Sequence, residues 1–320
     1  MPTTEPDPRP ESGPNPSPPD SGGSSAARKA GIMQESIQKA AVLIEALPYI
    51  RDFEGKTVVI KYGGAAMTDP ELRRSTAEDI VLMKYVGMNP VIVHGGGPAI
   101  NETLKRLNIQ SSFNAHGLRV TDDATIEVVE MVLAGKLNKD IVSLLNRAGG
   151  NAVGLSGKDG NMLFAQKKLM PDGSDIGHVG EIVQVNTRIV DTLTAAGLVP
   201  VIAPIATDAQ GGTWNVNADT AAGEVAGALR AEKLVFLTDT PGLLRDVKDP
   251  NSLIHQLRVD EVASLQAEGI IAGGMIPKVE ACITALTAGV RKTHIIDGRV
   301  SHSLLLEIFT REGLGTLVSH

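Results

Sequence analysis

The sequence predicts an α/β protein, a three-layer αβα sandwich whose central sheet is open and mainly parallel. Short β-branched runs end abruptly in glycines, as in VVIKYGG at 58–64 and VIVHGGGP at 91–98. A helical pattern follows each run, and strands alternate with helices in both halves of the chain, as in a buried parallel sheet. The composition agrees, since 42% of the residues are hydrophobic and only 3% aromatic, which suits a core packed with Val, Ile and Ala.

Length, charge and cysteine content exclude several classes of protein. A chain of 320 residues can bury a large core, as one α/β domain or as two lobes. A net charge of −7 without any Lys/Arg run argues against a nucleic-acid binder. Cys282 is the one cysteine, so an internal disulfide and a cysteine metal cluster are excluded, and its helical surroundings predict a core position. No apolar run approaches a membrane span and the acidic, proline-rich start does not resemble a secretory signal, so we expect a cytoplasmic protein.

The beginning of the chain predicts a tail and a helix that precede the sheet. We expect residues 1–30 to be a disordered tail, because up to about Ser25 there is almost nothing to bury. Apolar residues then recur at helical spacing from Met33 to Leu47, and Pro48 is expected to stop this helix. Such a helix either folds back on its own core or packs on another subunit. The remaining residues, 31–320, form one domain, with the extra helix in 31–50 and two lobes at 56–207 and 208–320.

The later elements follow from the spacing of apolar residues and from local turn signals. Asp69 and Pro70 mark a helix start, since an Asp cap and a first-turn proline both suit a helix N-terminus. Asp-Gly pairs at 159–160 and 172–173 predict hairpin turns. In order, we expect a helix at 69–85, a strand at 90–94, helices at 98–107 and 121–147, a strand at 152–155, an antiparallel patch at 157–185, a helix at 186–196, a strand at 198–205, a helix at 220–229, a strand at 233–237, helices at 259–268 and 274–288, a strand at 292–296 and a closing helix at 303–309.

The two glycine turns and nearby cations predict a site for anions. Glycines at the carboxyl ends of parallel strands expose N–H donors where ligands bind in open α/β sheets. Lys61 adds a positive charge at the first turn, although a strand-end lysine could also simply reach solvent. Lys278 opens a helix after Gly274, where the dipole disfavours a cation unless an anion is bound nearby; the alternative is a surface lysine. Arg119 could bind a carboxylate with its forked guanidinium, or form a surface ion pair.

Further polar residues follow in the second half of the chain. Asn215, Asn217 and Asp219 alternate, so they share one face if the segment is extended. They could hold a substrate, orient a lysine or help to position magnesium, or they could form a turn that caps the next helix. Thr238 and Asp239 end a strand and would lie on the nucleotide side.

No complete fingerprint of a common nucleotide or hydrolase loop is present. In GGG at 95–97 the third glycine of a dinucleotide fingerprint is missing, because Ile100 takes its place. The HGGG run also occurs in esterases, but GLSG at 154–157 lacks the spacing of a nucleophile elbow. A P-loop is absent as well. The glycine turns are therefore interpreted as an anion site of another kind.

Taken together, the motifs resemble the amino-acid kinase family, and within it the members that phosphorylate N-acetyl-L-glutamate. The resemblance covers nearly everything from about Ala46 onward and is carried by IKYGG at 60–64, VHGGGP at 93–98, GLRVT at 117–121, NVNAD at 215–219 and GMIPK at 274–278. It implies the amino-acid kinase fold. It also implies transfer of the γ-phosphoryl group of ATP to the γ-carboxylate of N-acetyl-L-glutamate, the second step of arginine biosynthesis.

The resemblance implies a role for each matching residue. Lys61 and Lys278 would stabilise the transferring phosphoryl group, and Asp219 would orient both lysines. Substrate-binding residues would be Gly63, Gly64, Gly96, Gly97, Arg119, Asn215 and Asn217. Nucleotide-binding residues would be Thr238, Asp239, Gly242, Gly274 and Lys278. Mg²⁺ would be held mainly by ATP phosphates, so no protein metal ligand is expected, and the lobe at 56–207 would bind acetylglutamate while 208–320 binds ATP.

The resemblance extends to members inhibited by L-arginine, whose N-terminal helix joins dimers into a hexamer. It implies a homo-oligomer, a dimer or a hexamer formed as a trimer of dimers, and an arginine site at Tyr49, His294, Glu307 and Gly313. Acetylaminoadipate of lysine biosynthesis is an alternative substrate, because one methylene gives only ~1–3 kcal/mol of discrimination. Another alternative is a non-catalytic arginine sensor or a partner of a nitrogen-signalling protein, but Lys61 and Lys278 are both present, which favours an enzyme.

Overall fold

The structure is a computed structural model that describes residues 22–114, 117–310 and 313–320. It divides into two compact units, Met1–Leu47 and Pro48–His320. Of the tail expected at 1–30, residues 1–21 lie outside the described residues.

The first described element is helix α1 (Gly22–Phe53), which is longer than the sequence indicates. It begins before Met33 and continues through Pro48, so the prediction that Pro48 stops this helix is wrong. A proline inside a helix removes one hydrogen bond and strains one turn, but the residues on both sides keep their own bonds, so the helix is able to continue. Many large apolar side chains of α1 are exposed, namely Ile32, Met33, Ile37, Val42, Leu43, Ile44 and Leu47.

The second unit is built on an eight-stranded sheet. Its strand order is β10-β12-β11-β9-β1-β2-β6-β3. The strands are β1 (Thr57–Tyr62), β2 (Asn89–His94), β3 (Ala152–Ser156), β6 (Val199–Ala203), β9 (Lys233–Thr238), β10 (Gln256–Arg258), β11 (Lys292–Asp297) and β12 (Thr316–Ser319). Every pairing is parallel except that of β11 with β12. The predicted fold class, with a mainly parallel open sheet, is therefore confirmed, but β12 was not predicted, and the chain does not close on the helix at 303–309.

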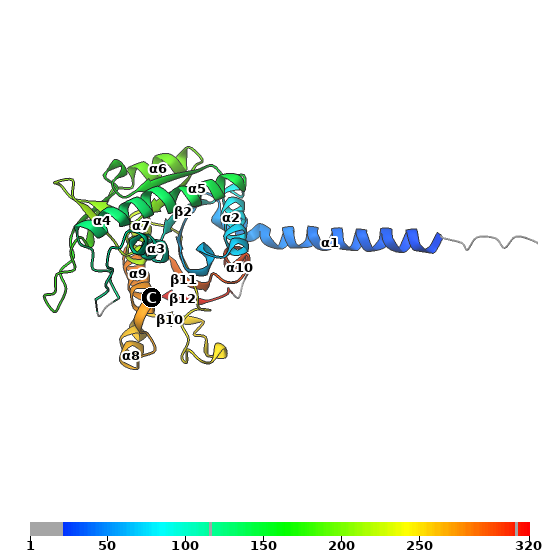
Figure 1. The fold of residues 1–320 in the computed structure, drawn as a ribbon. Helices are drawn as coiled ribbons and strands as arrows, with labels where there is room; N and C mark the ends of the chain where they lie inside the picture. Colours follow the sequence, from blue (N-terminus) through cyan, green and yellow to red (C-terminus); the bar gives the residue numbers. More distant parts are fainter. Residues whose placement is uncertain (1–21, 115–116, 311–312) are drawn as a thin grey trace, which may run out of the picture. The chain divides into compact units, whose positions relative to one another are not determined.

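Helices cover both faces of this sheet (Figure 1). One face packs against α2 (Pro70–Tyr85), α5 (Asn138–Arg147) and α10 (Ser303–Phe309) through a core that includes Val58 and Ile60. The other packs against α7 (Ala218–Ala228) and α9 (Ile276–Thr287) through a core that includes Val59. Because successive strand residues point to opposite faces, Lys61 shares the face of Val59, toward α7 and α9.

A smaller sheet has the order β5-β4-β7-β8, and its antiparallel β4–β5 pair confirms the predicted antiparallel patch, although β4 pairs with β7 in parallel. This sheet consists of β4 (Leu163–Lys167), β5 (Gly180–Val185), β7 (Ile205–Thr207) and β8 (Thr213–Asn215). The hairpin turn predicted at 159–160 is wrong, because Asp159 and Gly160 lie in a 3₁₀ segment between strands of different sheets. The single strand expected at 198–205 is divided between two sheets, since β6 ends at Ala203 and β7 begins at Ile205. Pro204 stands between them and lacks the N–H that a continuous ladder would need.

The remaining helices agree with the predicted order. They are α3 (Gly97–Arg106), α4 (Asp123–Glu130), α6 (Arg188–Ala195) and α8 (Val262–Ala267). The helix expected at 121–147 is interrupted by a π-helical segment, η2 (Met131–Leu137), between α4 and α5. Short 3₁₀ segments are η1 (Gly64–Met67), η3 (Asp159–Asn161), η4 (Pro250–Ser252), η5 (Val259–Glu261) and η6 (Gly273–Met275).

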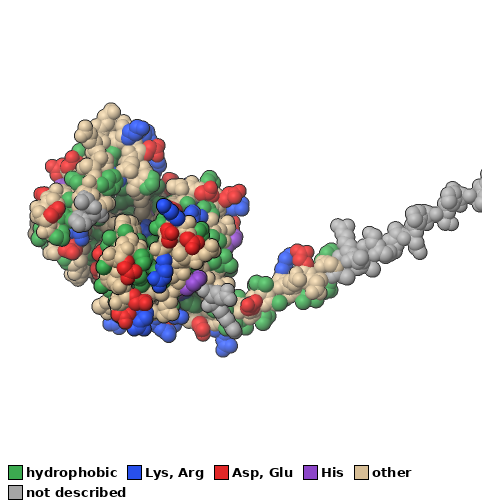
Figure 2. Space-filling model, turned by 90° about the horizontal axis from the view of Figure 1, so that it is seen from below, with side chains coloured by type: hydrophobic (Ala, Val, Ile, Leu, Met, Phe, Trp, Pro, Cys, Tyr) green, Lys and Arg blue, Asp and Glu red, His purple; other side chains and the backbone are tan. Residues whose placement is uncertain are grey.

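The interior and the surface also agree with the composition. Cys282 is fully buried in α9, as predicted for a core residue. Acidic and basic side chains are intermixed on the face shown in Figure 2, without a large area of one charge. Within the described ranges, no helix combines the length and the apolar character that crossing a membrane requires.

Candidate active site

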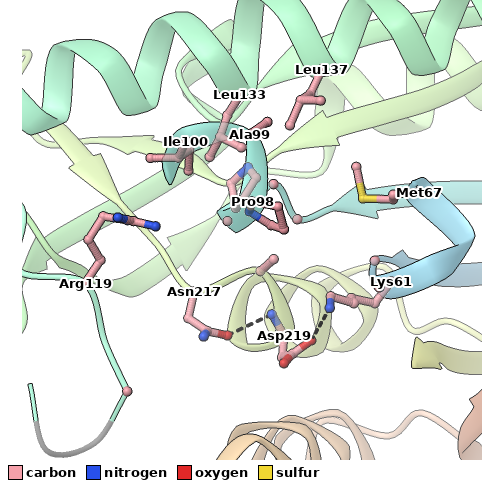
Figure 3. A pocket seen from close by; sticks show the side chains of 18 of the residues that line it. Lys61, Met67, Pro98, Ala99, Ile100, Arg119, Leu133, Leu137, Asn217 and Asp219 are labelled. Atoms are coloured by element: carbon pink, nitrogen blue, oxygen red, sulfur yellow. Dashed lines mark hydrogen bonds and ion pairs between the residues drawn. The ribbon is translucent and has the colours of Figure 1, made fainter. Parts of the chain in front are cut away.

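A cavity of about 750 Å³ lies where β1 and β2 end, and it brings most of the predicted site residues together. Figure 3 shows part of its lining, with side chains from both glycine turns and from the start of α7. The polar and glycine residues that line it include Lys61, Gly63, Gly64, Gly95, Gly96, Gly97, Arg119, Asn215, Asn217, Asp219, Asp239, Lys278 and Arg299. This position agrees with the general rule that ligands of open α/β sheets bind at the carboxyl ends of the strands.

Asp219 lies between two lysines inside this cavity. Its Oδ1 is 2.9 Å from Lys61 Nζ, and its Oδ2 accepts a hydrogen bond of 2.7 Å from Lys278 Nζ. Burial alone would raise the pKa of Asp219, but the charges of Lys61 and Lys278 outweigh burial and hold that pKa below its usual value. The carboxylate is therefore ionised, and it fixes two cations at one point that faces the cavity.

The packing of two helices determines this arrangement. Asn217 caps α7 by accepting hydrogen bonds from the backbone N–H groups of Asp219 and Thr220, so Asp219 sits in the first turn. A Cβ at Gly223 would lie 2.7 Å from the backbone oxygen of Ala281, so only glycine allows α7 and α9 to approach this closely. The first turns of the two helices, with Asp219 and Lys278, are therefore side by side.

At two of the glycines a side chain would meet neighbouring residues at close range. Gly64 has φ +64°, and a Cβ there would collide with the carboxylate of Asp239. A Cβ at Gly96 would collide with Leu133 and Leu137, which belong to η2. Side chains at these positions would thus disturb the shape of the cavity.

His94 supports the second glycine turn through hydrogen bonds. Sequence reasoning missed this role of His94. Its side chain is fully buried, with Nδ1 2.9 Å from the carbonyl oxygen of Gly95 and Nε2 3.3 Å from the amide nitrogen of Asn138. Burial lowers the pKa of His94 to about 4, so the ring is neutral and Nδ1–H donates to Gly95. Asn138 also donates to Leu155 O and Val201 O, which ties the turn to two neighbouring strands. Only the position of His94 at a buried strand end could have indicated this.

Arg119 lies on the opposite side of the cavity from Lys61 (Figure 3). Only 7% of it is exposed, and it donates to Asn101 Oδ1 over 2.6 Å and to Ser111 Oγ. Its guanidinium carbon is 4.6 Å from the centre of the Phe113 ring. Among residues 22–114, 117–310 and 313–320, Arg119 has no acidic partner. The structure therefore does not support the alternative that Arg119 forms a surface ion pair. A buried cation without an acid is well suited to a carboxylate ligand.

The other predicted site residues are divided between the cavity and its support. Asn215 lines the cavity and donates to Thr121 Oγ1 over 3.2 Å, while Asn217 uses its oxygen as the cap of α7. Asp239 lines the cavity and accepts the backbone N–H of Ala65. Three predicted nucleotide residues do not line this cavity, and they are Thr238, Gly242 and Gly274. Thr238 instead donates to the backbone of β11 and of the following turn.

Three of the residues expected to bind arginine, His294, Glu307 and Gly313, lie together in a separate cluster. Glu307 Oε1 is 3.0 Å from both Lys233 Nζ and His294 Nε2, and Oε2 accepts the backbone N–H of Leu314 over 3.0 Å. Lys233 was not expected, because a strand-start lysine gives no signal in the sequence. Gly313 has φ +63°, and a Cβ there would lie 2.9 Å from the Glu307 carboxylate. Tyr49 is half-buried in α1, and no hydrogen bond joins it to this cluster in the part of the chain that the structure describes. Residues 311–312, which precede Gly313, lie outside the described ranges.

Carboxylates and histidines do not gather into a metal site. In the described ranges there is no group of three or more His, Cys, Asp or Glu side chains that could hold a metal ion. Asp219 is already bound to two lysines, and Asp239 is the other carboxylate that lines the cavity. A divalent cation in this cavity would therefore need most of its ligands from a bound nucleotide and water.

Comparison with known proteins identifies the family. The description "Amino acid kinase family" matches residues 56–297, so the chain belongs to that family. A curated "Acetylglutamate kinase" of Pelotomaculum thermopropionicum is 60% identical over 289 residues, which are 88% of this chain and 98% of the relative. Another, of Heliobacterium modesticaldum, is 56% identical over 294 residues, which are 89% of this chain and 99% of the relative.

A solved structure with a similar fold supports the same fold assignment. The N-acetylglutamate synthase of Neisseria gonorrhoeae, complexed with coenzyme A and N-acetyl-glutamate, is similar with a TM-score of 0.77 and 29% identity. The match covers 88% of this chain and 63% of the synthase chain. The amino acid kinase fold expected from the motifs is thus confirmed.

Proposed function

We propose that this chain transfers the γ-phosphoryl group of ATP to the γ-carboxylate of N-acetyl-L-glutamate, the second step of arginine biosynthesis. The observation that carries the proposal is the pair Lys61 and Lys278, held by Asp219 in one cavity opposite Arg119. The curated relatives that carry the name acetylglutamate kinase support the same substrate. We further infer that the lobe at 56–207 binds the acceptor and the lobe at 208–320 binds the nucleotide.

Positioning and charge account for catalysis in this proposal. Charge spreads onto the oxygens of the phosphoryl group during transfer, and the ammonium groups of Lys61 and Lys278 stabilise it. Glycine N–H groups of the two turns approach the phosphoryl and carboxylate oxygens. The acceptor carboxylate is ionised before it attacks, so no general base is needed and Asp219 remains an orienting group. Mg²⁺, held mainly by ATP phosphates, neutralises part of the negative charge.

At the end of the acceptor away from the γ-carboxylate, Arg119 binds the α-carboxylate with two parallel hydrogen bonds. Asn215 donates to the acetamido group, and Asn217 contributes the amide N–H₂ that its capping role leaves available. The distance between Arg119 and the lysines then sets the length of acid that fits.

Acyl-phosphate formation, trapped with hydroxylamine, tests the substrate. N-acetyl-L-glutamate and N-acetylaminoadipate are compared with ATP and Mg²⁺, each with and without L-arginine. We expect turnover of acetylglutamate. A preference for the longer acid would assign the chain to lysine biosynthesis instead. No acyl phosphate from either acid would leave the non-catalytic arginine sensor as the better proposal.

Inhibition by L-arginine and assembly into a hexamer are a second part of the proposal. The cluster of Glu307, Lys233 and His294 supplies a buried carboxylate for a guanidinium, and Gly313 lies against it. The exposed apolar side chains of α1 support contacts with further subunits, since such a series is costly in water. Arginine would inhibit only if it binds one state of the assembly better than another. An activity that stays constant across arginine concentrations would refute this part.

A further inference from the structure

Arg299 also lines the main cavity, and the reaction proposed above gives it no role. It follows β11 by two residues, and 49% of its side chain is exposed. An arginine in a loop carries no signal of its own, so the sequence predicts no role for Arg299.

The guanidinium of Arg299 is held by its neighbour Asp297. Nε donates to Asp297 Oδ1 over 2.9 Å and Nη2 donates to Oδ2 over 2.8 Å, while the backbone N–H of Arg299 donates to Oδ1 over 2.9 Å. One edge of the guanidinium is thus fixed. The other edge, with Nη1, has no protein partner among residues 22–114, 117–310 and 313–320. A planar group fixed at one edge presents its remaining donors in a constant direction.

The backbone that carries Arg299 is packed against the strands that end at the cavity. Asp297 is in register with Thr238 of β9, and the N–H of Gly298 donates to Thr238 O over 2.8 Å. A Cβ at Gly298 would lie 3.2 Å from the side chain of Ala66, next to the first glycine turn. The guanidinium is therefore placed by a tightly packed turn rather than by a free loop.

The strand order places Arg299 on the other side of Lys61 from Arg119. The strand order runs β11-β9-β1-β2, with Lys61 on β1 in the middle. Arg299 follows β11 on one side, next to Asp239, whose charge lies within electrostatic reach. Arg119 contacts Asn101 of α3, the helix that follows β2 on the other side. The two arginines thus lie on opposite sides of the lysines. Because Arg119 is assigned to the acceptor, Arg299 lies on the side left for the nucleotide, whose triphosphate carries more negative charge than the acceptor.

We propose that Arg299 is a phosphate-binding residue of the nucleotide site, in which its free Nη1 edge donates to phosphate oxygens while Asp297 holds the opposite edge. This inference rests on the proposed function for the identity of the nucleotide. It adds a third cation, from the turn that follows β11, to Lys61 and Lys278. Guanidinium groups suit this task because their forked donors match phosphate oxygens.

The test compares R299Q with R258Q, a closely matched control. Arg258 binds Asp260 in the same two-pronged way, Nε to Oδ1 over 3.0 Å and Nη2 to Oδ2 over 3.1 Å, but it does not line the cavity. Calorimetry with Mg²⁺ measures the Kd of AMP-PNP, ADP and AMP without acceptor, and steady-state kinetics give the KM of ATP and of the acceptor. We expect R299Q to weaken AMP-PNP binding and to raise the KM of ATP by roughly tenfold, with R258Q unchanged.

Two further comparisons test whether Arg299 contacts the phosphates of the nucleotide. In R299Q, the affinity for AMP should fall much less than the affinity for AMP-PNP. R299K keeps the positive charge and should therefore recover part of the lost affinity for AMP-PNP. R299K also replaces R299Q in the test if R299Q does not fold. An unchanged Kd for AMP-PNP in folded R299Q or R299K would overturn the inference, as would an equal loss for AMP or a change confined to the acceptor KM. If the wild-type chain forms no acyl phosphate but binds AMP-PNP in a way that depends on Arg299, the proposed function fails and the phosphate contact stands.

Discussion

Asp219 is the residue on which the two lysines depend. Replacing it by Asn keeps the size and the cap of α7 but removes the charge that holds Lys61 and Lys278 together. We expect D219N to lower kcat by about 10²- to 10³-fold, as when a preorganised charged group is lost from an active site. Steady-state acyl-phosphate kinetics measure the loss. D260N, at an exposed carboxylate outside the cavity, is the control and should keep wild-type kcat; a D219N enzyme with wild-type kcat would disprove the orienting role.

His94 makes the stability of the protein depend on pH. Burial lowers its pKa from 6.5 to about 4, so between these values the unfolded chain takes up a proton that the folded chain does not. The free energy of unfolding should therefore fall as the pH falls from 6.5 to 4, by about 1.4 kcal/mol for each pH unit from this group alone. Urea unfolding at several pH values should show a smaller loss over this window in H94N than in the wild type. H255N, at an exposed position, should keep the wild-type slope; the same slope in H94N would contradict the assignment.

Single residues differ in how far the sequence alone could place them. Asn215, Asn217 and Asp219 do line one cavity, as their polar pattern indicated, but the segment is not extended throughout, because Asn217 caps α7 and Asp219 lies in its first turn. Lys233 and Arg299 could not be found this way. Their partners, Glu307 for the first and the cavity for the second, depend on strand order, which no local pattern contains.

At the scale of elements, the contact of α7 with α9 sets the distance between Asp219 and Lys278. A Cβ at Gly223 would meet the backbone of Ala281, which cannot turn aside like a flexible side chain. We expect G223A to lower the free energy of unfolding by ~1–3 kcal/mol and to lower kcat as well, because the helices must move apart. Thermal melts and acyl-phosphate kinetics measure both effects. At Gly135 a Cβ would meet nothing within 4 Å, so G135A should not destabilise; equal melting of both variants would refute the close approach.

The elements themselves were predicted best where the apolar period is long and the turn chemistry is clear. Asp69 and Pro70 begin α2 as expected. The failures have physical causes. Helix α1 passes through Pro48, since one missing hydrogen bond does not end a long helix. The strand expected at 198–205 breaks at Pro204, and β12 is too short for its alternation to be distinguished from a loop.

At the scale of the whole molecule, the proposed hexamer depends on α1 while the cavity does not. The cavity is lined entirely by residues of the unit Pro48–His320. Deleting residues 1–47 should therefore leave acyl-phosphate formation within about twofold of the full chain, but reduce the mass measured by light scattering from a hexamer to a dimer. A full-length chain that is no larger than the truncated one would refute the role of α1 in assembly.

The place of β12 in the sheet has a consequence for synthesis on the ribosome. Strand β10 pairs with β12 alone in the described sheet, and Leu257 is in register with Val318, far along the chain. At ribosomal rates of about 5–20 residues per second, several seconds pass between the synthesis of β10 and that of its pairing partner β12. Once β11 has been synthesised, it also presents an unpaired edge until β12 follows, and such an edge can pair with the wrong strand. A nascent chain stalled before β12 should therefore be a better chaperone substrate than one released after it.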